Sequence, residues 1–188
     1  MRSFTAKRLV FTGLCIALGV VLPIAFHSIP NAGSIFLPMH IPVLLCGLAC
    51  GWQYGLACGV ITPLLSSLLT GMPPAAFLPA MVCELAVYGL LTGIMSKVIK
   101  TKSIYAGLYV QLITAMLAGR AVYGLLNALI FRAGEYTFSV WLSAVFVTSL
   151  PGIAIQLVLI PLLVIALRKA KLIEYGEKRI KRSAAEAV

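Results

Sequence analysis

The sequence predicts an all-α integral membrane protein with six transmembrane helices, and two observations support this fold class. The 188-residue chain is 61% hydrophobic and only 11% charged, with a mean hydropathy of +1.05, which is typical of polytopic membrane proteins. Several uninterrupted apolar stretches also reach the roughly 18 to 20 residues that cross a hydrocarbon core about 30 Å thick. We therefore expect residues 1–188 to form a single membrane domain without a soluble domain.

The first predicted helix covers about residues 9–27. It follows a basic cluster, as a signal peptide would, but no small-residue cleavage site precedes Pro23 and the apolar run is long enough to span the bilayer. The stretch HSIPNAGSIFLP follows it, and its prolines, asparagine and glycine predict a loop that ends near His40.

The apolar run Met39–Leu69 could form one long helix or two shorter ones, and the distribution of charge distinguishes these possibilities. If the run crosses twice, thirteen of the fifteen Lys and Arg residues share one side of the membrane, and only Arg120 and Arg132 fall elsewhere. The positive-inside rule assigns that side to the cytoplasm. We therefore predict helices at about residues 39–52 and 55–70, joined by a cytoplasmic turn near GWQYG.

The remaining helices are expected at about residues 75–99, 103–131 and 137–167, followed by a basic tail at 168–188. Both termini are then cytoplasmic. The net charge of +10 is explained by this topology and by attraction to anionic lipids of the bilayer, so we expect no nucleic-acid partner.

Small residues recur along the predicted hairpin. Gly47, Gly51, Gly55 and Gly59 are spaced four residues apart, and small residues at this spacing let helix backbones approach closely. The five cysteines form no CxxC pair, so we expect packing residues rather than disulfides.

Two ionisable residues, Glu84 and Arg120, lie within predicted spans at about the same depth below the outer surface. Charged groups inside a membrane are costly unless they are paired or hydrated, and they commonly mark functional sites. Two interpretations stay open: a permanent ion pair that joins two helices, or a site for substrate binding or gating.

Other polar residues are placed to complete a small pocket that opens to the outside. Tyr123 and Asn127 share a helical face with Arg120, and the last span contains Thr148, Ser149 and the amide of Gln156. The candidate substrate-binding residues are Glu84, Arg120, Tyr123, Asn127, His40, Tyr88 and Gln156.

His40 lies between two prolines and is predicted to begin a helix at the outer face, as a neutral hydrogen-bonding group at the pocket mouth. A metal site is not expected, because the chain has no HxxxH, CxxC or carboxylate cluster. We expect no enzyme, because both histidines are predicted at the membrane surface and no GxSxG motif is present. Without a Walker motif, the chain itself should not hydrolyse ATP.

Three stretches resemble the substrate-binding S component of energy-coupling factor (ECF) vitamin transporters: LPMHIPVLLCGLACGWQYGLACGVITPLLSSLLTGMPP, ELAVYGLLTG and AGRAVYGLL. The resemblance covers nearly the whole chain. It implies a multi-pass subunit in a prokaryotic cell membrane that captures a vitamin-like small molecule from outside. It also implies docking on a transmembrane coupling protein with two cytoplasmic ATPase subunits, which hydrolyse the ATP, so that this chain binds no cofactor.

The resemblance also assigns roles to particular segments. It implies a docking surface on the first helix, where Gly13 and Ala17 form the matching small-xxx-small motif. It implies that the loop Ser28–His40 acts as a lid over the site. A ligand with an acceptor for Arg120 and a donor for Glu84 would fit, which favours pantothenate-like or pyridoxine-like molecules. The alternatives are a solitary secondary transporter of a small polar solute and, less favoured, an intramembrane enzyme.

Overall fold

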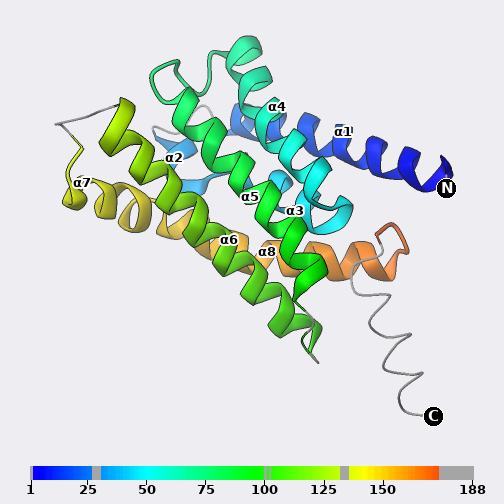
Figure 1. Ribbon diagram of the computed structural model, residues 1–188. Helices are drawn as coiled ribbons and strands as arrows, with labels where there is room; N and C mark the ends of the chain where they lie inside the picture. Colours follow the sequence, from blue (N-terminus) through cyan, green and yellow to red (C-terminus); the bar gives the residue numbers. More distant parts are fainter. Residues whose placement is uncertain (1, 27–30, 100, 102, 132–135, 174–188) are drawn as a thin grey trace.

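The computed structural model describes residues 2–26, 31–99, 101, 103–131 and 136–173 (Figure 1). In this part of the chain every regular element is a helix: α1 (Arg2–Ala25), α2 (Ala32–Phe36), α3 (His40–Cys50), α4 (Trp52–Thr70), α5 (Leu78–Val98), α6 (Ile104–Leu126), the π-helical η1 (Asn127–Phe131), α7 (Phe138–Leu142), the π-helical η2 (Ser143–Val147) and α8 (Leu150–Lys169). Six helical segments are long and apolar enough to cross a membrane. These six spans, found within the described residues, confirm the predicted six-helix membrane fold. Helices suit a membrane because each helix satisfies its own backbone hydrogen bonds in lipid.

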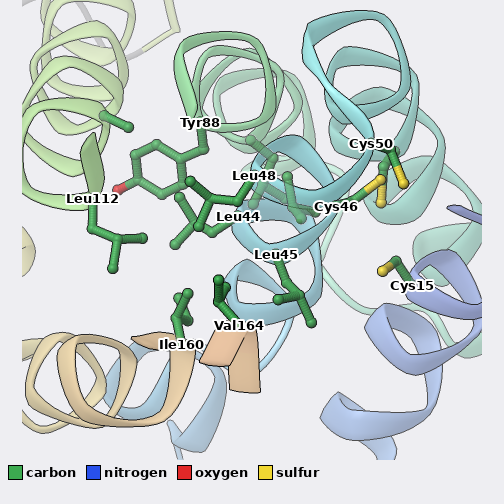
Figure 2. Packing of buried hydrophobic residues seen from close by; sticks show 14 of the residues in the cluster. Cys15, Leu44, Leu45, Cys46, Leu48, Cys50, Tyr88, Leu112, Ile160 and Val164 are labelled. Carbon is green, nitrogen blue, oxygen red and sulfur yellow. The ribbon is translucent and has the colours of Figure 1, made fainter. Parts of the chain in front are cut away.

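Helix α3 lies at the centre of the bundle. It packs against α1, α4, α5 and α8, and its span is the most deeply buried of the six. The core shown in Figure 2 includes Leu44 and Leu48 of α3, Tyr88 of α5, Leu112 of α6 and Ile160 of α8. Helices α1, α6 and α8 also direct many large apolar side chains outward, as lipid-facing helices do.

Helices α3 and α4 form the predicted hairpin. The chain turns at Gly51, where φ is 97° and ψ is 174°. Glycine adopts this conformation because it has no Cβ atom. The turn therefore lies at the start of the predicted GWQYG stretch.

The glycine stripe of the hairpin packs against α5. A methyl group added to Gly47, Gly55 or Gly59 would overlap an atom of α5; Gly55, for example, faces the carbonyl oxygen of Gly89. Backbones this close require small residues. The prediction of close helix packing is confirmed for these three positions, whereas Gly51 provides the turn.

The segment predicted as a loop after the first span contains the short helix α2. Residues 27–30, including the start of the predicted lid, lie outside the described part of the chain. Helix α2 packs on α8, where a methyl group on Gly152 would lie 2.7 Å from the carbonyl oxygen of Ile35. The described part of the predicted lid is therefore a docked helix followed by buried residues at 37–39.

The last predicted span, 137–167, is not one continuous helix, and this part of the prediction is wrong. Helix α7 passes into η2, a turn follows at Thr148 and Ser149, and α8 begins at Leu150. Pro151 lacks a backbone N–H and disfavours the preceding helical conformation. The Ser149 hydroxyl donates to the Val145 carbonyl at 2.7 Å, and the Thr148 hydroxyl and backbone N–H both donate to the Ser143 carbonyl, at 3.2 Å and 2.9 Å.

Basic residues gather at one end of the bundle. A cavity of about 70 Å³ is lined by Lys7 and Arg8 of α1, Cys50 at the end of α3, and Lys171 just after α8. The start of α1 and the ends of α3 and α8 therefore lie on the same side, as the predicted hairpin requires.

Candidate substrate-binding site

Four polar side chains from α3, α5 and α6 meet inside the bundle. Nη1 of Arg120 lies 3.2 Å from Oε1 of Glu84, and the hydroxyl of Tyr88 donates to the same oxygen at 3.0 Å. Nε2 of His40 lies 3.7 Å from Oε2 of Glu84. Each of the four residues is at most 6% exposed. The structure thus brings together four of the seven predicted binding residues, which we call the Glu84 cluster.

Local sequence explains how this cluster forms. Glu84 and Tyr88 lie one turn apart on α5, so their side chains share a face. A methyl group on Gly119 would overlap the Tyr88 ring, so this glycine lets α6 approach closely enough for Arg120 to reach Glu84. The prediction that Glu84 and Arg120 meet at one depth is confirmed. Pairing reduces the high cost of holding either charge in a membrane.

Arg120 uses only part of its guanidinium group in this pair. Among the residues that the structure describes, Nε and Nη2 of Arg120 have no hydrogen-bond partner. These two nitrogens point their N–H groups along one edge of the planar group, and such an edge can hold a carboxylate through two parallel hydrogen bonds. Arg120 is therefore paired at one nitrogen, and the Nε–Nη2 edge has no hydrogen-bond partner among the described residues.

Gln156 of α8 is a second buried polar residue whose side chain lacks hydrogen-bond partners within the described residues. It is 1% exposed, and within the described residues neither its Nε2 nor its Oε1 has a hydrogen-bond partner. Gln156 lies one turn before Ile160, and His40 lies one turn before Leu44 in the same core (Figure 2). Helices α3 and α8 run in the same direction, because their starts adjoin α2 and their ends adjoin the basic cavity. Gln156 and His40 therefore both lie toward the α2 end of the bundle.

His40 is not at a pocket mouth, and the prediction of a surface position is wrong. The residue is 1% exposed, and its ring centroid lies 5.4 Å from that of Tyr88. The reason is that α2 and residues 37–39 extend the same apolar span, Ala32–Cys50, so His40 is eight residues inside it. His27, the other predicted surface histidine, lies outside the described residues.

The remaining predicted residues extend the polar face of α6. Asn127 is buried, and its Nδ2 donates to the carbonyl oxygen of Tyr123 at 2.8 Å. Tyr123 is half-buried. The hydroxyls of Thr148 and Ser149 are used on backbone carbonyls of η2.

Trp141 of α7 is a contributor that the sequence reasoning missed. Its Nε1 donates to the carbonyl oxygen of Arg120 at 3.1 Å, and a methyl group on Gly124 would overlap its indole ring. Trp141 therefore ties α7 to α6 beside the cluster. The sequence contains a feature that indicates this role: Trp141 lies inside an apolar run, and its indole N–H needs a hydrogen-bond partner there.

The predicted docking residues lie apart from this site. Gly13 and Ala17 are exposed on α1, and a methyl group added to Gly13 would have no atom within 4 Å. Large exposed apolar side chains surround them: Leu9, Val10, Leu14, Leu18 and Val21.

Within the described residues, no group of three or more His, Cys, Asp or Glu side chains is placed to hold a metal ion. All five cysteines are free and four are buried. Cys46, for example, lies 3.5 Å from the hydroxyl of Thr12, between α3 and α1.

Comparison with known families identifies the kind of protein that holds this site. A family model described as "ECF transporter, substrate-specific component" matches residues 7–164. The chain belongs to this family. As an ECF substrate-specific component it is a multi-pass membrane protein and a substrate-binding transport subunit that associates with ECF partners, not an enzyme. Comparisons with curated proteins and with solved structures find no match.

Proposed function

We propose that this substrate-specific component captures a vitamin or related micronutrient with high affinity for an importer driven by ATP hydrolysis. The observation that carries the proposal is that Arg120 of the Glu84 cluster and Gln156 of α8 keep buried polar atoms without partners among the described residues. A buried group left unsatisfied costs roughly 1–3 kcal/mol, and a polar ligand would offset that cost. The proposed substrate-binding residues are Glu84, Arg120, Tyr123, Asn127, His40, Tyr88 and Gln156.

The proposed partners are a transmembrane coupling protein and two cytoplasmic ATPase subunits. The exposed small residues Gly13 and Ala17 support docking through α1, because close helix approach inside a membrane depends on small residues. The sequence contains no Walker motif, which supports ATP hydrolysis on the partner subunits, with no cofactor bound by this chain.

The proposed orientation places both termini in the cytoplasm of a prokaryotic cell. The basic cavity around Lys7, Arg8 and Lys171 supports it, because positive residues are retained on the cytoplasmic side. The Glu84 cluster is then in the outer half of the membrane, since α3 and α5 both run from the cluster toward the basic end. Uptake would begin from outside, past α2.

The proposed substrates are pantothenate-like or pyridoxine-like molecules, which are small and rich in hydrogen-bonding groups. Native mass spectrometry of the full-length protein in lipid nanodiscs tests the proposal, and one micronutrient should copurify. Arg120→Ala should remove it. If nothing copurifies, and the protein alone moves a polar solute into liposomes without an ATPase, the chain is a solitary secondary transporter and the proposal is wrong.

A further inference from the structure

We infer that the substrate of this subunit is a monoanionic carboxylate, held along the Nε–Nη2 edge of Arg120, with Gln156 contacting a second polar group of the same molecule. The inference rests on the proposed function and narrows it to a chemical class. It also gives Glu84 a further role, as the residue that positions Arg120.

The first step concerns the roles of the two charged residues. Oε1 of Glu84 already accepts from Tyr88 and pairs with Nη1 of Arg120, and Oε2 faces His40. Glu84 is therefore held through Oε1, whereas Oε2 has only the longer contact of 3.7 Å to His40. Its effect on Arg120 is to fix one nitrogen, so that the edge formed by Nε and Nη2 keeps one orientation.

The second step concerns what that edge can recognise. Two parallel N–H donors match the two oxygens of a carboxylate, whereas a single carbonyl or hydroxyl would satisfy only part of the edge. A phosphate would also match in geometry, but it adds up to two negative charges beside Glu84. Because Arg120 is already neutralised by Glu84 and both are at most 6% exposed, the smaller charge of a carboxylate is favoured.

The third step concerns Gln156. Its amide offers both a donor and an acceptor, and both are open within the described residues. A ligand group that is itself donor and acceptor, such as an amide or a hydroxyl, satisfies both atoms. The substrate is thus an acid with a neutral polar group near the carboxylate. Of the two molecules favoured above, pantothenate carries a carboxylate and pyridoxine does not.

The test uses full-length protein in nanodiscs. Native mass spectrometry identifies the copurified molecule, and isothermal titration then compares the acid with its neutral analogue, beginning with pantothenate and panthenol. We expect the acid to bind at least about a hundredfold more tightly, because a charged bidentate contact is lost in the analogue. Arg120→Lys keeps the positive charge beside Glu84 but lacks the planar edge, so this preference should fall by about tenfold or more. Arg168→Lys, at the far end of α8, is the matched control. This variant should keep the parent's preference for the acid over its neutral analogue.

A second variant guards against a folding defect in Arg120→Lys. Gln156→Met keeps a similar volume and removes the buried amide, so the ligand-free protein should melt no lower than the parent. The same variant should lose most of the upward shift in melting temperature that the acid causes. If Gln156 had a purely structural role, the ligand-free variant would melt at a lower temperature than the parent, and the acid would still raise its melting temperature as it does in the parent.

The outcomes separate this inference from the proposed function. A neutral copurified micronutrient, or an undiminished acid preference in Arg120→Lys, overturns the carboxylate assignment and leaves the proposed function standing. If no micronutrient copurifies or binds, the proposed function fails, and the inference fails with it.

Discussion

The two ends of α3 and α5 build unlike regions of the molecule. At one end, His40 and Glu84 belong to the buried Glu84 cluster, in which two nitrogens of Arg120 have no partners in the described structure. Toward the other end, Gly47 and Gly89 bring α3, α4 and α5 into backbone contact. The same pair of helices therefore carries a region suited to binding and a region suited to rigid packing.

This difference has a physical origin in the membrane. Helices in lipid gain little from burying apolar side chains, so close packing of small residues supplies much of their association. A polar cluster with unsatisfied groups opposes that association. We infer that the glycine end stabilises the bundle enough to tolerate the cost of the polar end.

The largest effect is expected when the ion pair is broken on one side. Glu84→Ala leaves Arg120 charged and buried without its partner, which should cost about 3–5 kcal/mol of folding free energy. Thermal melting of the purified protein in detergent measures this loss. Substrate binding should also fall, because Arg120 is no longer held in position.

The matched control removes both charges. Glu84→Leu combined with Arg120→Met should restore most of the stability, because replacing a whole buried ion pair with apolar residues is often neutral or stabilising. Binding should stay lost in this double variant. A single Glu84→Ala variant as stable as the parent would show that the pair is not buried as described.

The next effect concerns the packed end. Gly55→Ala places a methyl group against the carbonyl oxygen of Gly89, and overpacking of this kind costs about 1–3 kcal/mol. Gly13→Ala is the control, since a methyl group there meets no atom within 4 Å. Equal melting temperatures for the two variants would contradict the assigned contact between α4 and α5.

A smaller effect is expected at the border of the polar cluster. Trp141→Phe removes the hydrogen bond from Nε1 to the carbonyl of Arg120 while keeping an aromatic ring. The loss should be about 1 kcal/mol of stability. The binding free energy of the copurified ligand, measured by titration, should weaken by the same amount or less. Greater stability in the variant would argue against this hydrogen bond.

The packed end could be predicted from the sequence more completely than the polar end. Apolar run lengths, the spacing of Gly47, Gly55 and Gly59, and the distribution of lysine and arginine depend on composition along the chain, so they are visible without a structure. The meeting of Glu84 and Arg120 was also predictable, because each is a charged residue deep inside its predicted span and the two lie at a similar depth.

The details of the polar end depend on how segments pack in three dimensions. The depth of His40 follows from the docking of α2 on Gly152 of α8, and no local pattern specifies that contact. The break before α8 depends on Pro151 and on the turn at Thr148 and Ser149, whose hydroxyls donate to carbonyls of η2. The open edge of Arg120 depends on which nitrogen meets Glu84, and that choice is made by side-chain geometry.

The smallest effect on stability is expected on the outer face of α1. Gly13→Leu adds a large side chain where nothing lies within 4 Å, so the isolated protein should change by no more than about 0.5 kcal/mol. The same side chain would block close approach of a partner helix at Gly13 and Ala17. Copurification with the coupling protein and its ATPases should therefore fall sharply, while binding of the copurified ligand to the isolated subunit stays unchanged. Intact assembly in this variant would place the docking surface elsewhere, whereas a large loss of stability would mean that this face of α1 packs within the subunit.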